Sequence, residues 1–152
     1  MGERDYVNDY VNDLWGGRLW MGSYSAALHT PTRPDLHIHC AYECEPVASG
    51  AETIWLRLDD APIHWETNQN WVNRVLDTAG KGVRALDEGK IVVVNCFAGL
   101  NRSGLIAALI LMLGYDMSAE YATAHIQRRR SPLALGNSSF ERFLHSVDQE
   151  IH

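Results

Sequence analysis

The spacing of apolar residues changes several times along the 152-residue chain, and each spacing predicts a different element. Short apolar runs and strict alternation are typical of strands, whereas apolar positions that recur every three to four residues are typical of helices. We therefore expect strands at 14–15, 19–21, 36–41, 53–58 and 91–94, the first two joined by a hairpin at Gly16-Gly17. We expect helices at 67–88, 105–113, 118–130 and 137–151.

Strands that alternate with helices predict an α/β fold, here one domain with a central, mostly parallel, twisted sheet of about five strands flanked by helices on both sides. The uninterrupted run Val92-Val93-Val94 supports this prediction, because strands of parallel sheets are buried on both faces. Residues 1–13 are polar and hold a small tandem repeat, Tyr-Val-Asn-Asp, at 6–9 and 10–13. We interpret them as an N-terminal segment and assign the domain to 14–152.

The composition narrows the class of protein. Apolar residues make up 46% and charged residues 21% of the chain, which is ordinary for a soluble globular domain. The net charge of −6 argues against broad binding of nucleic acid, which requires neutralised phosphates. No apolar run is long enough to span a membrane, and no signal peptide is evident. Three cysteines are too few for a disulfide scaffold, so we expect a reducing compartment and, by default, the cytoplasm. We also expect a monomer.

The segment 92–104 carries the candidate chemistry. A buried strand ends at Cys96, a glycine-containing loop follows, and Arg102-Ser103 begins the next helix. Loop amides and a helix N-terminus of this kind attract an anion, commonly phosphate. The same positive potential would favour the thiolate of Cys96, and Arg102 could grip two phosphate oxygens. A lone cysteine is more often an inert buried residue, but an arginine at a helix N-terminus is unfavourable unless an anion is present.

Cys96-x5-Arg102-Ser103 resembles the signature of cysteine-dependent protein tyrosine phosphatases, and the short chain resembles their compact dual-specificity branch. The resemblance implies a phosphoprotein phosphatase that works through a phosphocysteine, without metal or cofactor. In its terms Cys96 is the nucleophile, Arg102 binds phosphate and Ser103 assists the sulfur. The implied phosphate-binding loop consists of Phe97, Ala98, Gly99, Leu100 and Asn101. The run 18–23 resembles the family's first strand, and 23–28 the short helix that follows it.

Two further roles follow from the resemblance. The family carries its general acid on the loop after the strand 53–58, which favours Asp60, with Asp59 as the alternative; adjacent carboxylates at a strand end are otherwise turn formers or caps. Asn137 loosely matches a polar residue that the family places near the attacking water, although a plain helix cap is an equal interpretation. The family usually has histidine directly before the nucleophile, where this chain has Asn95.

Several alternatives stay open. The stretch 99–104 also resembles the RNA 5′-triphosphatase branch, which shares the asparagine before the arginine. A phosphate-binding pseudophosphatase is a third possibility. His37 and His39 lack an evident third ligand for a metal, so we expect them to face solvent or to be satisfied by neighbours.

Two other groups of side chains each have two interpretations. The basic run 128–130 either complements a helix C-terminus or borders the active site. Cys40 and Cys44 are ordinary thiols or partners for an oxidised Cys96.

Overall fold

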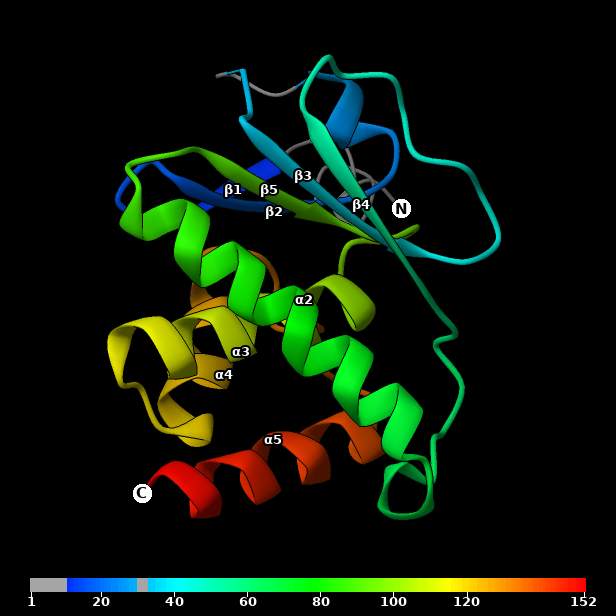
Figure 1. Cartoon of the computed structure of the whole chain (residues 1–152), viewed down its shortest axis with the longest axis vertical. Helices are drawn as coiled ribbons and strands as arrows, with labels where there is room; N and C mark the ends of the chain where they lie inside the picture. The colour runs from blue at the N-terminus through cyan, green and yellow to red at the C-terminus, as the bar shows by residue number, and fades with distance from the viewer. Residues whose placement is uncertain (1–10, 30–32) are drawn as a thin grey trace.

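The computed structural model describes residues 11–29 and 33–152 as one α/β domain, as predicted (Figure 1). Its five-stranded sheet has the order β1-β2-β5-β3-β4 and is parallel except for the β1–β2 hairpin. The strands are β1 (Val11–Trp15), β2 (Leu19–Gly22), β3 (Leu36–Ala41), β4 (Glu52–Leu58) and β5 (Val92–Asn95). The helices are η1 (Ala26–His29), η2 (Trp65–Thr67), α2 (Gln69–Asp87), α3 (Arg102–Tyr115), α4 (Ala119–Arg129) and α5 (Ser138–Ile151).

The hairpin begins earlier than the sequence pattern indicated. Residues 11–13, which we interpreted as part of the N-terminal segment, belong to β1. The first copy of the tandem repeat and Tyr10 lie outside the described residues. At the turn, Gly16 and Gly17 have φ angles of +58° and +73°, a conformation that favours glycine.

The two faces of the sheet are covered unequally, with the short η1 as the helix on the second face. Figure 1 shows all four α-helices on one face, with η1 and connecting segments on the other. Val92 and Val94 join the large core against the helices, whereas Val93 packs with Val11 and Ala26 of η1 on the opposite face. The short η1 leaves room on that second face for polar side chains of β3 and β5.

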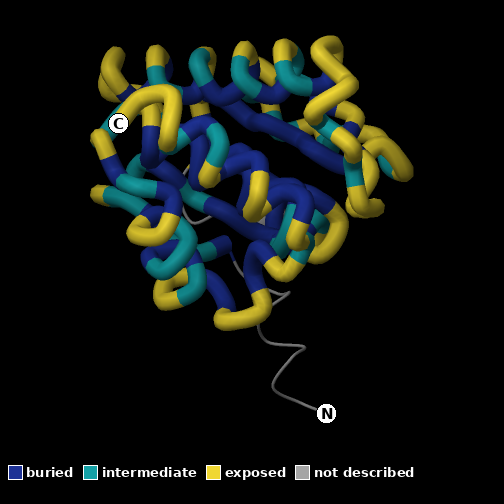
Figure 2. Tube along the Cα trace, turned by 90° about the horizontal axis from the view of Figure 1, so that it is seen from below, coloured by how far each residue is buried: buried dark blue, intermediate teal, exposed yellow. Residues whose placement is uncertain are grey.

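The helices form where sequence spacing predicted them, because each has a face that the core can bury. Helix α3 is enclosed from Arg102 to Met112, and α2 and α5 each bury one stripe. Figure 2 shows the resulting pattern, with buried segments at the centre and exposed residues on the outer turns of the helices. In the described part of the chain, none of the helices has the length and apolarity needed to cross a membrane.

The ends of the helices follow local hydrogen bonding. The Ser118 hydroxyl accepts from the Tyr121 N–H and begins α4, as predicted. The preceding helix, which we expected to end at residue 113, continues through Gly114 as part of α3. A Cβ at Gly114 would make an ordinary van der Waals contact with Val83. Asp116, with φ of +58°, provides the left-handed C-cap.

The sheet topology places the loop 96–101 at the carboxyl end of the central strand. Strand β5 is the central strand, hydrogen-bonded to β2 on one side and β3 on the other. Its carboxyl end runs into the loop 96–101 and then directly into the buried helix α3. Ligands of open α/β sheets bind at such carboxyl ends, beside the crossover point of the strand order.

Two glycines of α2 give a matched test of its packing. An added Cβ at Gly82 would lie 2.6 Å from Ile110 Cδ1 and 3.1 Å from its Cγ1, in the closed core, whereas at Gly80 the nearest atom is Arg84 Nη1 at 3.6 Å. We expect Gly80→Ala to raise the free energy of unfolding by about 0.5–1 kcal/mol. Gly82→Ala should lower it by about 1–3 kcal/mol through overpacking. Urea denaturation measures both, and equal stabilisation would contradict this packing.

Candidate functional site

Cys96 lies at the end of β5 with its sulfur turned into the loop that follows. The residue is 2% exposed. The Gly99 N–H donates to Sγ over 3.2 Å, and Ser103 Oγ lies 3.3 Å from the same sulfur. A thiolate here would therefore accept from a backbone amide and from the Ser103 hydroxyl, which are the contacts that favour the charged form of a thiol.

The carbonyl groups of the loop all find donors outside it. The Cys96 carbonyl accepts from Asn95 Nδ2 over 3.2 Å, and the Phe97 carbonyl from the Tyr24 N–H over 3.0 Å. Arg130 donates to two carbonyls, from Nη2 to Ala98 over 3.3 Å and from Nε to Gly99 over 3.0 Å. The Leu100 carbonyl accepts from the Leu135 N–H over 3.2 Å. In a trans peptide unit the C=O and the next N–H point in opposite directions. The five amide N–H groups from Phe97 to Asn101 are thus turned away from these anchors, toward the interior of the loop.

Two backbone conformations hold this arrangement. Gly99 has φ of +73°, and a Cβ there would lie 2.4 Å from the carbonyl carbon of Gly22, so the loop passes against the end of β2 too closely for any side chain. Leu135, the donor to Leu100, has φ of +62°, a costly conformation for leucine, and packs against Gly104 of α3. Strain of this kind is concentrated at functional sites.

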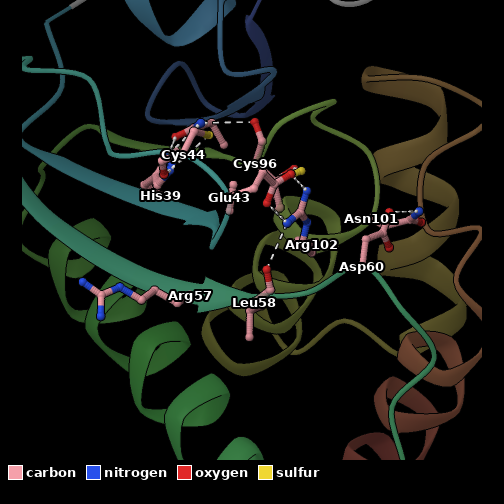
Figure 3. A network of polar contacts seen from close by, with 12 residues as sticks. His39, Glu43, Cys44, Arg57, Leu58, Asp60, Cys96, Asn101 and Arg102 are labelled. Carbon is pink, nitrogen blue, oxygen red and sulfur yellow. Dashed lines mark hydrogen bonds and ion pairs between the residues drawn. The ribbon is translucent and has the colours of Figure 1, made fainter.

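The guanidinium of Arg102 forms hydrogen bonds through Nη1 and Nη2 but not through Nε. Nη1 and Nη2 donate to the two carboxylate oxygens of Glu43 over 2.6 and 2.8 Å, and Nη1 also donates to the Leu58 carbonyl over 2.9 Å (Figure 3). Nε is buried and has no hydrogen-bond partner. Burial alone would lower the pKa of Arg102, but the Glu43 carboxylate and the Cys96 sulfur raise it above its ordinary value. Arg102 in turn lowers the pKa of Glu43.

Asp60 is the carboxylate that the structure fixes beside this loop. Asn101 Nδ2 donates to its Oδ2 over 3.1 Å, and Asn137 Nδ2 donates to its Oδ1 over 3.3 Å and to its carbonyl over 3.2 Å. Figure 3 shows Asp60 and Glu43 on opposite sides of Arg102. Asn137 also caps α5, accepting from the N–H groups of Ser139 and Phe140, so the two interpretations of this residue are compatible.

The three arginines of the basic run 128–130 differ: two fit the interpretation as cations at a helix C-terminus, and one contacts the candidate site. Arg128 and Arg129 are exposed at the end of α4, and Arg128 lies over the Tyr121 ring. Arg130 is buried beneath the loop and grips the carbonyl oxygens of Ala98 and Gly99, with Nη1 donating to Asn12 Oδ1 over 2.8 Å. Burial lowers the pKa of Arg130 to about 10. Sequence reasoning did not single out this arginine among the three, because nothing in the run itself distinguishes it.

The residues behind Cys96 form a buried polar cluster that the sequence did not predict. Asn95, His37 and His39 are at most 1% exposed, so the histidines do not face solvent. His39 has neighbours at both ring nitrogens, whereas His37 is bound through Nε2 and its Nδ1 is buried without a partner. Both contact Asn95. Glu43 was also missed, since a lone glutamate after a strand has no distinguishing spacing.

The structure gathers most of the predicted site residues and separates a few. Cys96, Arg102, Ser103 and the loop amides converge, and Asn101 links the loop to Asp60. The side chain of Phe97 is 58% exposed, while Leu100 packs on the hydrophobic core. Cys40 and Cys44 are free thiols, and burial, followed by the negative charge at Cys96, raises the pKa of Cys40 well above its ordinary value.

The groups gathered around the loop determine which chemistry the site can support. The loop offers converging amide donors, a guanidinium with one unpartnered N–H, and a sulfur at the centre of the donors. A tetrahedral oxyanion satisfies such a set, and the sulfur of Cys96, a possible nucleophile, lies within the same loop. A carboxylate at the rim can give or take a proton.

Comparison with known proteins gives a consistent assignment. Residues 19–150 match the family model of the dual specificity phosphatase catalytic domain, which confirms the resemblance. Tyrosine-protein phosphatase yvh1 of Schizosaccharomyces pombe is 33% identical over 144 residues, which cover 90% of this chain. The chain spans 42% of the length of that relative.

Solved structures share the fold. Human DUSP28 has a TM-score of 0.79 at 18% identity, with 93% of this chain and 94% of that chain covered. A mouse putative dual specificity phosphatase complexed with zinc tungstate has a TM-score of 0.79 at 20% identity, covering 94% and 89%. Human tyrosine phosphatase-like serine/threonine/tyrosine-interacting protein has a TM-score of 0.76 at 22% identity, covering 94% and 98%.

The anchoring of the loop by Arg130 can be tested against its exposed neighbour. Lysine carries the same charge but cannot donate to the carbonyls of Ala98 and Gly99 and to Asn12 at once. We expect Arg130→Lys to weaken binding of inorganic phosphate by about 10-fold or more, since each charge-assisted bond contributes about 1.5–3 kcal/mol. Arg129→Lys should leave it unchanged. Equal phosphate affinities of the two variants, measured by calorimetry, would show that Arg130 does not organise the loop.

Proposed function

The chain belongs to the family of dual specificity phosphatase catalytic domains, and on that basis we propose that it hydrolyses phosphotyrosine, and also phosphoserine and phosphothreonine, in proteins. Cys96 is the nucleophile, Arg102 and the loop amides bind the phosphoryl group, and Asp60 is the general acid and base. The proposed reaction needs no metal ion or cofactor, because the thiolate, the guanidinium and the carboxylate supply the nucleophile, the anion site and the proton.

The observation that carries this proposal is the unpartnered Nε of Arg102. A buried N–H without an acceptor costs about 1–3 kcal/mol, so native proteins rarely leave one. Glu43 and Leu58 take only Nη1 and Nη2, which fixes the guanidinium plane and leaves its Nε edge for another acceptor. A phosphoryl oxygen that also meets the inward amides of the loop would satisfy it.

In the proposed first step, Cys96 Sγ attacks phosphorus and the bond from phosphorus to the ester oxygen breaks. The Asp60 carboxyl gives its proton to the departing oxygen of the serine, threonine or tyrosine side chain. Arg102 and the amides of 97–102 stabilise the equatorial oxygens, where charge spreads in the transition state. The products are the free hydroxyl and a phosphocysteine.

In the second step water attacks phosphorus and the sulfur–phosphorus bond breaks. The Asp60 carboxylate takes a proton from the water, and in this proposal Asn137, which donates to Asp60, orients that water. The Ser103 hydroxyl, 3.3 Å from Sγ, donates to the sulfur as it departs as thiolate. Inorganic phosphate leaves, and Asp60 is again protonated for the next cycle.

The loop composition supports a phosphoprotein substrate. Phe97, Ala98 and Leu100 place no lysine beside the phosphate, whereas the phosphoinositide-directed branch has a basic loop. Asn101, which the chain shares with the RNA 5′-triphosphatase branch, is occupied with Asp60 and with the Asn137 N–H. This engagement gives Asn101 a local role in placing the acid, without an RNA ligand.

Turnover of para-nitrophenyl phosphate and of phosphotyrosine and phosphothreonine peptides tests the assignment. We expect Cys96→Ser to abolish hydrolysis, because an alkoxide does not form at neutral pH. Asp60→Asn should lower kcat on phosphothreonine peptides by about 10²–10⁴-fold, the usual size of general acid catalysis. Asp59→Asn is the matched control and should have little effect.

Triphosphorylated RNA is the competing substrate in the same assay. Preferred release of the γ-phosphate from RNA would replace the phosphoprotein assignment, and activity that survives Cys96→Ser would reject the mechanism. Binding of phosphopeptide without turnover by the wild-type chain would identify a pseudophosphatase.

A further inference from the structure

A hydrogen-bonded cluster lies directly behind the nucleophile, on the sheet face away from the α-helices. His39 of β3 is paired with Asn95 of β5 in the parallel register, and His37, two residues earlier and paired with Val93, lies on the same face. His37 Nε2 lies 2.5 Å from Asn95 Oδ1, and His39 Nδ1 lies 3.1 Å from Asn95 Nδ2. The rings of Tyr24 and Trp55 enclose His39.

The contacts at the far edge of His39 assign its proton. Nε2 lies 2.7 Å from the Cys44 carbonyl oxygen, which can only accept, so Nε2 carries the hydrogen. In the neutral ring Nδ1 is then an acceptor, and its nearest neighbour is the amide nitrogen of Asn95. The second hydrogen of that nitrogen is directed to the Cys96 carbonyl over 3.2 Å.

The other edge of the amide is consistent with this assignment. Asn95 Oδ1 accepts from His37 Nε2, so in the neutral ring His37 Nδ1 carries no hydrogen. This Nδ1 atom is buried without a partner. Burial lowers the pKa of His37, the hydrogen bond with Asn95 opposes this shift, and the neighbouring His39 lowers the pKa further. Because Asn95 Oδ1 can only accept, Nε2 is the donor of this pair. The amide can therefore point only one way, with both N–H groups committed.

We propose that His39 is a positioning residue for the reaction. By accepting from Asn95, it holds the amide that grips the Cys96 carbonyl, and this grip turns the N–H of Phe97 into the oxyanion site. The Cys44 carbonyl sets the tautomer on which the chain of bonds depends. The inference rests on the proposed function, because it assumes that the loop binds a phosphoryl oxyanion.

Three substitutions separate positioning from packing. His39→Asn places an amide oxygen near the position of Nδ1 and keeps an acceptor for Asn95. His39→Gln reaches the Cys44 carbonyl but withdraws that acceptor. Trp55→Phe, beside His39, changes the packing of the same face and loses a bond to Ala41, without touching Asn95.

The inhibition constant of inorganic phosphate, kcat and KM for para-nitrophenyl phosphate, and the urea midpoint are measured for each. We expect His39→Gln to raise the inhibition constant by about 10-fold, the usual effect of one lost charge-assisted bond, and to lower kcat more than it raises KM. His39→Asn should stay within about threefold of the wild type in phosphate affinity, less than the effect of one hydrogen bond. Trp55→Phe should change stability alone.

The outcomes distinguish this inference from the proposed function. A wild-type chain that neither binds phosphate nor turns over substrate rejects the proposed function itself. An active wild type with a His39→Gln variant that is folded and binds phosphate equally well rejects the positioning role. Weakening by Trp55→Phe to the same degree as by His39→Gln also rejects it, because packing alone would then explain the effect. If His39→Gln does not fold, His39→Asn provides the test. This variant keeps the acceptor for Asn95, so phosphate binding weakened by more than about 10-fold would also reject the positioning role.

Discussion

The anchoring of five successive carbonyl groups outside the loop 96–101 is the constraint on which the rest of the site depends. A short loop of this kind has no regular partner for its backbone, and its N–H groups converge only if its C=O groups are all held elsewhere. The anchors come from distant parts of the chain, including Tyr24, Arg130 and Leu135. The sheet, α4 and the segment before α5 are therefore all required for one loop conformation.

This arrangement concentrates charge that must be compensated. Arg102 and Arg130 are both buried next to the loop. Glu43 neutralises Arg102 through a bidentate pair, while Arg130 donates to carbonyl groups of the loop and burial lowers its pKa. Two buried guanidinium groups thus make different contacts: Arg102 leaves its Nε edge for the proposed ligand, and Arg130 supports the backbone of the loop.

Much of the fold could be predicted from sequence, because it follows from local spacing. The run Val92-Val93-Val94 indicated a central buried strand, and the enclosed helix from Leu105 followed from uniform apolarity. The predicted end of that helix was wrong because Gly114 continues the helix, and Asp116 adopts the left-handed cap instead. The α-helices lie on one face and the short η1 with polar side chains on the other, an unequal distribution that the periodicity does not reveal.

The candidate site was predictable only where its residues are close together in the chain. Cys96, Arg102 and Ser103 lie within one motif, and the resemblance pointed to Asp60. Glu43, Arg130 and His39 act through contacts across 31 to 59 positions of sequence, so their parts could not be read from spacing. The roles assigned to the site residues stay predictions until they are measured.

The central claim is that the sulfur of Cys96 takes the phosphoryl group within this loop. The most direct measurement is rapid acid quench of the wild-type chain during turnover of a phosphopeptide, followed by mass spectrometry of the peptide that contains Cys96. The account predicts a transient increase in mass of one phosphoryl group on Cys96. Steady turnover with no phosphorylated Cys96 at any quench time, or with the phosphoryl group on another residue, would contradict it.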